Sequence, residues 1–119
     1  MTASPEFLEF LKDQLSTFGP VSARRLFGGA GLFRDNLMFA LIAQDTLYFK
    51  IDARNRPDFE AAGMEPFTYE GKGKKMQMSY FEVPPDVLED PADLADWARK
   101  AFEAALAGAK AKGKTKKKT

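Results

Sequence analysis

RRLFGGAGLF, residues 24–33, places three glycines inside an apolar run that otherwise has the composition of a β-strand. Glycine in the interior of a strand sacrifices side-chain packing, so such a cluster needs a structural reason: a bulge, a sharp bend, or the close approach of another backbone. The sequence predicts a bent first strand that packs closely beneath a helix, with core candidates Phe27, Leu32 and Phe33.

The same glycines could cradle a phosphate with backbone N–H groups. A Walker loop, however, needs a later Gly-Lys-Ser/Thr, and a dinucleotide fingerprint needs a third glycine where Arg34 stands. Neither is present, so the structural explanation is preferred and no nucleotide cofactor is expected.

Hydrophobic periodicity on either side of the glycine run predicts three helices and five strands. The helices are expected at 5–18, 57–63 and 91–106, and Ser4 and Asp90 are the expected N-caps of the first and the last. The strands are expected at 21–33, 37–43, 46–51, 66–69 and 76–83. This order, α-β-β-β-α-β-β-α, indicates a two-layer α+β domain with helices on one face of a mainly antiparallel five-stranded sheet.

Cysteine and histidine are both absent from the 119 residues. Their absence removes disulfides, thiolate metal sites, cysteine nucleophiles and the commonest general base. The acids before the last helix are explained by the helix dipole without a metal ion: Asp86, Glu89, Asp90 and Asp93. We therefore expect no catalytic residue, no cofactor and no metal site.

The first residues lack the basic and apolar regions of a signal peptide, and no apolar run reaches the roughly 20 residues of a membrane span. A cytoplasmic protein without a membrane partner is expected. The net charge of +1 conceals a division, because residues 108–119 hold six lysines and no acid, and residues 1–107 carry a net charge of −5. We expect a folded domain at 1–107 and a flexible lysine-rich tail at 108–119.

Several motifs in their order resemble the N-terminal domain of the bacterial TfoX/Sxy competence-regulator family. They are RLFGGAGLF (25–33), FALIA (39–43), LYFK (47–50), FEAAG (59–63), PFTY (66–69) and MSYFEVP (78–84). The resemblance covers about residues 20–107, and its signature positions here are Phe27, Gly28, Gly29, Gly31, Ser79, Tyr80, Glu82 and Pro84. It implies a fold like that of the type III secretion chaperones and a regulatory, non-catalytic role beside a transcription activator.

Basic residues are the candidates for contacts with an anion or a protein partner. Alternation along a strand sends Arg24 and Arg25 to opposite faces, and Arg34 follows the glycine run. Lys72, Lys74 and Lys75 lie at the expected tip of the second hairpin, where a simple solvated loop is the plainer explanation.

Two functional hypotheses follow. The first is a non-enzymatic regulatory domain that acts through protein–protein contacts. The alternative is a nucleic-acid-associated accessory protein whose tail gives weak, non-specific phosphate binding through Lys110, Lys112, Lys114, Lys116, Lys117 and Lys118, although the same lysines suit a solubilising terminus.

We also expect a homodimer, partly because the secretion-chaperone-like fold implies one. The second reason is that the strand at 37–43 is apolar on both faces, with Leu37, Phe39 and Leu41 on one and Met38, Ala40 and Ile42 on the other.

Overall fold

The computed structural model describes residues 3–26, 29–71 and 73–117, with side chains described except at 69–71, 74–77 and 111–117. Within these residues the elements are α1 (Pro5–Gln14), β1 (Ser22–Leu26), β2 (Gly29–Arg34), β3 (Leu37–Ala43), β4 (Thr46–Lys50), α2 (Arg56–Ala61), β5 (Pro66–Gly71), β6 (Lys74–Glu82), α3 (Pro85–Glu89) and α4 (Pro91–Lys117). The α+β class is therefore confirmed.

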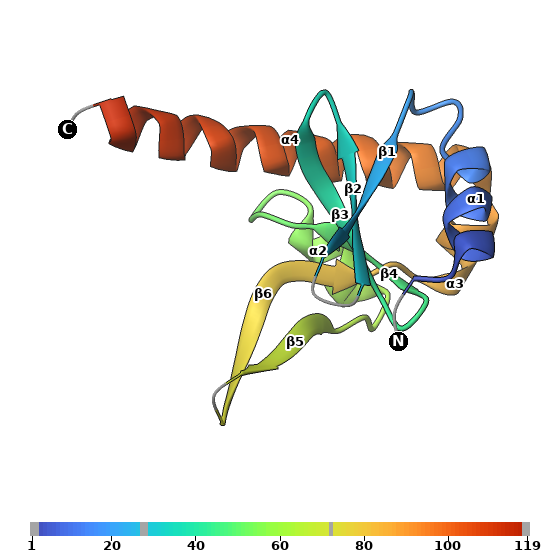
Figure 1. Cartoon of the computed structure of the whole chain (residues 1–119), viewed down its shortest axis with the longest axis horizontal. Helices are drawn as coiled ribbons and strands as arrows, with labels where there is room; N and C mark the ends of the chain where they lie inside the picture. Colours follow the sequence, from blue (N-terminus) through green and yellow to red (C-terminus); the bar gives the residue numbers. More distant parts are fainter. Residues whose placement is uncertain (1–2, 27–28, 72, 118–119) are drawn as a thin grey trace.

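The strands form one antiparallel sheet in the order β1-β2-β3-β4-β6-β5. Helix α4 crosses the sheet against β3 and β4 and continues beyond it, and the β5–β6 hairpin extends from the body (Figure 1). Buried side chains from all four helices join one core with the sheet, including Leu11, Phe59, Val87 and Leu94. The described helices thus cover a single face.

The prediction of five strands is wrong because the glycine run forms a hairpin and not the interior of one strand. Strand β1 pairs with β2 in a register that sets Leu26 opposite Gly29. The chain therefore reverses direction between Leu26 and Gly29. Residues 27 and 28 lie outside the described residues, and so does the prediction that Phe27 belongs to the core. The expected likeness to type III secretion chaperones stays a prediction.

The expected N-caps and the turn at residues 44–45 are confirmed, whereas the prediction of three helices is wrong, because Pro85–Glu89 forms an additional short helix, α3. Ser4 Oγ accepts a hydrogen bond from the Phe7 N–H at 3.2 Å, and Asp90 Oδ1 accepts from the N–H groups of Ala92 and Asp93. The turn at Gln44 and Asp45 has φ values of 52° and 55°. Positive φ at both central residues is what a type I′ hairpin turn of two residues requires.

Helix α4 is longer than the sequence predicts. The expected end is near Leu106, but the backbone continues as a helix to Lys117, while the described buried positions stop at Ala105. Alanine and lysine are good helix formers, and a helix already nucleated by packing propagates at little cost. The division into a domain at 1–107 and a flexible tail stays a prediction.

A bulge in β3 directs Phe39 into the core. Leu32 pairs with Ala40 and Phe33 pairs with Met38, which leaves Phe39 as an extra residue. Its ring is fully buried, with its centroid 5.1 Å from that of Phe18 and 6.0 Å from that of Phe49. Burial of one such side chain stabilises the fold by about 1.5–3 kcal/mol. The expected alternation of β3 is therefore wrong, because Phe39 shares the core face with Ala40 and Ile42.

Candidate protein-binding face of the sheet

One row of paired residues defines the sheet face that lies opposite the helices. Arg24 pairs with Gly31, Gly31 with Leu41, Leu41 with Tyr48, and Tyr48 with Glu82. Directly opposed residues in an antiparallel sheet share a face. We call this the open face, and its other members include Leu26, Phe33, Met38, Lys50, Phe67 and Tyr80.

The apolar side chains of the open face are separate from the main core. Leu41 is 6% exposed and Tyr80 7% exposed, yet neither belongs to the core cluster that the helices share with the sheet. The ring centroids of Tyr48 and Phe67 lie 5.0 Å apart in an edge-to-face arrangement. The open face is thus a second apolar surface, which no helix of the described residues covers.

Gly31 allows three side chains to converge on this face. A Cβ atom at Gly31 would lie 2.8 Å from Met38 Sδ, 2.9 Å from Leu26 Cδ1 and 3.2 Å from Phe33 Cε1. Side chains from β1, β2 and β3 therefore meet over a backbone position that carries none. We call this group of Leu26, Phe33 and Met38 the Gly31 cluster.

Gly29 has a different role, since a Cβ atom there would lie 2.1 Å from the backbone oxygen of Ile42. The glycines of residues 29–31 thus permit close approach between neighbouring strands. The prediction that they pack beneath a helix is wrong. Leu32 is a core residue as predicted, whereas Phe33 is half-buried on the open face.

The phenol groups of the open face stay protonated near neutral pH. Burial raises the pKa of Tyr80 above its usual value. Burial also raises the pKa of Tyr48, and the negative charge of Glu82 adds to that rise. Both rings therefore contribute apolar area together with a neutral hydroxyl group.

Charged groups flank the apolar surface. The Arg24 guanidinium lies 4.7 Å from the centroid of the Phe33 ring, and the Lys50 ammonium lies 5.3 Å from that of Tyr80. Arg24 and Glu82 occupy the two ends of the paired row and take part in none of the ion pairs found in the described part of the chain.

Of the three predicted arginine contacts, two serve the fold. Arg24 and Arg25 do lie on opposite faces, and Arg25 Nη1 donates a hydrogen bond of 2.6 Å to the carbonyl of Ala3. The Arg34 guanidinium lies over two aromatic rings, 4.6 Å from the centroid of Phe18 and 5.1 Å from the centroid of Phe102. Arg24 alone of the three belongs to the open face.

Some of the other residues predicted from the sequence lie in the described part of the chain, and some lie outside it. Tyr80 and Glu82 lie on the open face, Ser79 is exposed, and Pro84 is buried where it precedes α3. Gly28 and Lys72 lie outside the described residues, as do the side chains of Lys74 and Lys75. The structure therefore brings together Arg24, Gly31, Tyr80 and Glu82 from the candidates.

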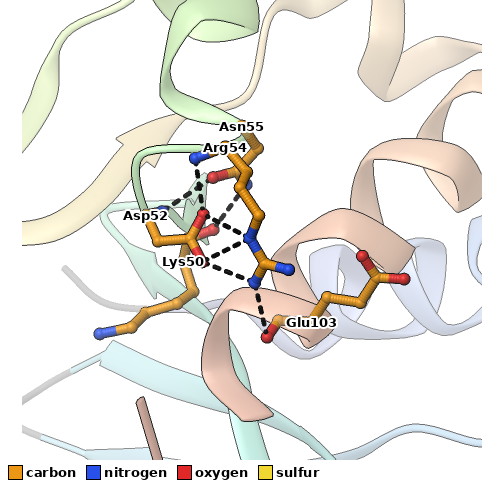
Figure 2. A network of polar contacts seen from close by, with 5 residues as sticks. All are labelled: Lys50, Asp52, Arg54, Asn55 and Glu103. Carbon is orange, nitrogen blue, oxygen red and sulfur yellow. Dashed lines mark hydrogen bonds and ion pairs between the residues drawn. The ribbon is translucent and has the colours of Figure 1, made fainter. Parts of the chain in front are cut away.

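A polar network that the sequence did not predict joins the loop after β4 to helix α4 (Figure 2). The Asn55 side chain is 2% exposed; its amide N–H donates to the Lys50 carbonyl at 3.1 Å and its oxygen accepts from the Asp52 N–H at 2.8 Å. Arg54 Nη2 donates to Asp52 Oδ2 at 2.7 Å and to the Glu103 carbonyl at 3.3 Å. The hydrogen bond from Arg54 lowers the pKa of Asp52. These hydrogen bonds hold the loop after β4 in its conformation.

In the part of the chain that the structure describes, no group of three or more acidic side chains is placed to hold a metal ion. Nor does any described helix have the length and apolar character needed to cross a bilayer. The architecture defines a small α+β domain whose sheet has one face in a helix-covered core and a second, apolar face without a helix.

Comparison with known proteins identifies the family. The family model of the TfoX N-terminal domain matches residues 13–105. The chain is also 33% identical over 101 residues to the DNA transformation protein TfoX1 of Aliivibrio fischeri (strain ATCC 700601 / ES114), a match that covers 82% of this chain and 44% of that protein. The chain belongs to the TfoX N-terminal domain family and spans less than half the length of this relative.

Proposed function

We propose that this chain is a non-enzymatic, cytoplasmic regulatory domain that acts through protein–protein contacts in a competence-related process. Membership of the TfoX N-terminal domain family and the relative's designation as a DNA transformation protein support the competence-related role. The partner that the family resemblance implies is a transcription activator.

The open face is the observation that carries this proposal. Its apolar side chains come from all six strands, and the opposite face of the same sheet already has a helix-covered core. Apolar area that leaves water contributes about 25 cal/mol per Å², so contact with a protein would stabilise this surface. Contiguous apolar patches flanked by polar groups commonly mark protein-binding sites.

Two matched substitutions test the role of the open face in the cell. Phe33 lies on the open face, whereas Phe10 lies on α1 and is 40% exposed. In a strain of the source organism that lacks the gene, we expect Phe10→Ser to restore the wild-type transcript profile and Phe33→Ser to fail. Circular dichroism of both purified variants establishes that they fold. A folded Phe33→Ser protein that restores transcripts fully would contradict the proposal.

The absence of catalysis has its own test. Purified protein is screened for turnover of small-molecule substrates, and variants of the open face are compared with the wild type. Turnover that is lost on substitution of one open-face residue would contradict the non-enzymatic role.

A second candidate function is weak binding of nucleic acid. Helix α4 extends past Ala105, the last of its described buried positions, and this extension includes Lys110 and the further lysines up to Lys117 (Figure 1). Clustered lysines beside an acidic domain can neutralise phosphates without reading bases. We expect the full chain to bind duplex DNA with an affinity that falls as salt rises, and a 1–107 truncation to lose that binding. Equal binding by the two proteins would exclude a role for the lysines.

A further inference from the structure

We propose that a second copy of this chain occupies the open face, with the two sheets stacked face to face about a two-fold axis that lies between them, close to the direction of β3, and passes over Leu41. This inference rests on the proposed function, because it names the partner of the surface to which that function assigns protein contacts. A transcription activator would then bind the pair elsewhere on its surface.

The paired row of the open face has a symmetric charge arrangement. Leu41 is the middle of its five positions, and Arg24 and Glu82 each lie two strands away from it, on opposite sides. With strands about 4.8 Å apart, each charge lies about 10 Å from the middle. A rotation by 180° about this axis therefore brings Arg24 of one protomer opposite Glu82 of its partner. The dimer contains two such pairs, one on each side of the axis.

A closed two-fold dimer requires that residue i of one copy meets residue j of the other while j meets i. Arg24 and Glu82 meet this condition because they have opposite charge and no ion-pair partner among the described residues. Aligned sheets pack about 10 Å apart and their strands cross at about 30°, so the axis is inclined by about 15° to β3 and the ends of the row are offset by about 5 Å. The long side chains of arginine and glutamate can span that offset.

The remaining positions of the row are compatible with the same symmetry. Gly31 and Tyr48 lie one strand from Leu41 on opposite sides, so Tyr48 of one copy faces the Gly31 cluster of its partner. An aromatic ring thus meets three apolar side chains, and Leu41 meets its own symmetry mate. Lys50 pairs with Tyr80, outside this row, and its ammonium lies over the Tyr80 ring.

Charge reversal provides the test. The molar mass of the purified chain is measured by sedimentation equilibrium from 1 to 200 µM for the wild type, Arg24→Glu, Glu82→Arg and the double variant. We expect a dimer of the wild type, at least tenfold weaker association of each single variant, and recovery to within about threefold in the double variant. Arg99→Glu, on the helical side of the molecule, is the matched control and should associate like the wild type.

Each other outcome overturns the inference. A wild type that is monomeric at 200 µM excludes a second copy, as do single variants that associate normally or a double variant that is not rescued. If the chain is monomeric while Phe33→Ser still fails to restore transcripts, then the open face binds a different protein, and the proposed function survives without this partner. Thermal unfolding of every variant excludes loss of the fold as the cause.

Discussion

Arg24 and Glu82 lie at opposite ends of one row of paired residues that crosses five strands of the sheet. They are 58 positions apart in the sequence. The order of the strands places each of them two strands away from the central Leu41. The proposed dimer depends on this relationship, and the stability of the face between them depends on its two described glycines.

Alanine in place of Gly29 should lower the free energy of unfolding more than alanine in place of Gly31. Gly29→Ala would place a Cβ atom 2.1 Å from a backbone oxygen, which cannot move without breaking strand pairing, so we expect a loss of more than about 2 kcal/mol in the free energy of unfolding. Gly31→Ala meets the ends of side chains, which can rotate, so we expect a loss of about 1 kcal/mol. Urea denaturation measures both, and equal losses would contradict the packing described for the run.

Arg34 should stabilise the fold through its two aromatic contacts. We expect Arg34→Met to lower the free energy of unfolding by about 1–2 kcal/mol, because the guanidinium stacks on the rings of Phe18 and Phe102. The control is Arg99→Met, which removes an exposed ion pair on α4 and should change stability by less than about 0.5 kcal/mol. Similar values for the two variants would show that the stacking contributes nothing.

The turn at Gln44 and Asp45 can be improved at one of its positions. Glutamine at a φ of 52° is in a region that glycine adopts more readily, so Gln44→Gly should raise the free energy of unfolding by about 0.5 kcal/mol. Asp45→Gly should give no such gain, because Asp45 Oδ1 accepts a hydrogen bond of 2.7 Å from the Ser4 N–H. Thermal melts of the two variants check this order, and a larger gain for Asp45→Gly would refute it.

Asp52 should make a small contribution to stability that depends on pH. The hydrogen bond from Arg54 lowers its pKa in the folded state, so its stabilising effect is fully present above the unfolded pKa of about 3.9 and disappears as the pH falls through the lowered folded value. Asp52→Asn should cost less than about 1 kcal/mol at pH 7, because water screens the pair, and nothing at a pH below both values. A cost that does not change with pH would indicate a role independent of charge.

Local features of the sequence predicted much of the fold. The caps Ser4 and Asp90 and the turn at Gln44 and Asp45 are predictable, because these signals depend on neighbouring residues. The bulge at Phe39 was not predictable in this way, since one extra residue reverses the expected alternation and only pairing with β2 reveals it.

The candidate site was only partly predictable for a similar reason. Alternation correctly separated Arg24 from Arg25, but the stacking of Arg34 depends on Phe18 and Phe102, which are distant in the sequence. The role of Gly31 depends on Met38 and Leu26 converging from neighbouring strands, and this convergence exists only because β1 and β2 form a hairpin.

Cross-linking between two single-cysteine variants tests the proposed dimer most directly, because the natural chain has no cysteine. Arg24→Cys and Glu82→Cys proteins are treated with a bismaleimide that spans about 8 Å, first separately and then as a mixture. Equivalent positions in the dimer are separated by about 20 Å across the row, four strand spacings. We expect covalent dimer in the mixture and almost none in either protein alone. No covalent dimer in the mixture, or equal yields of covalent dimer in all three samples, would contradict the proposed dimer.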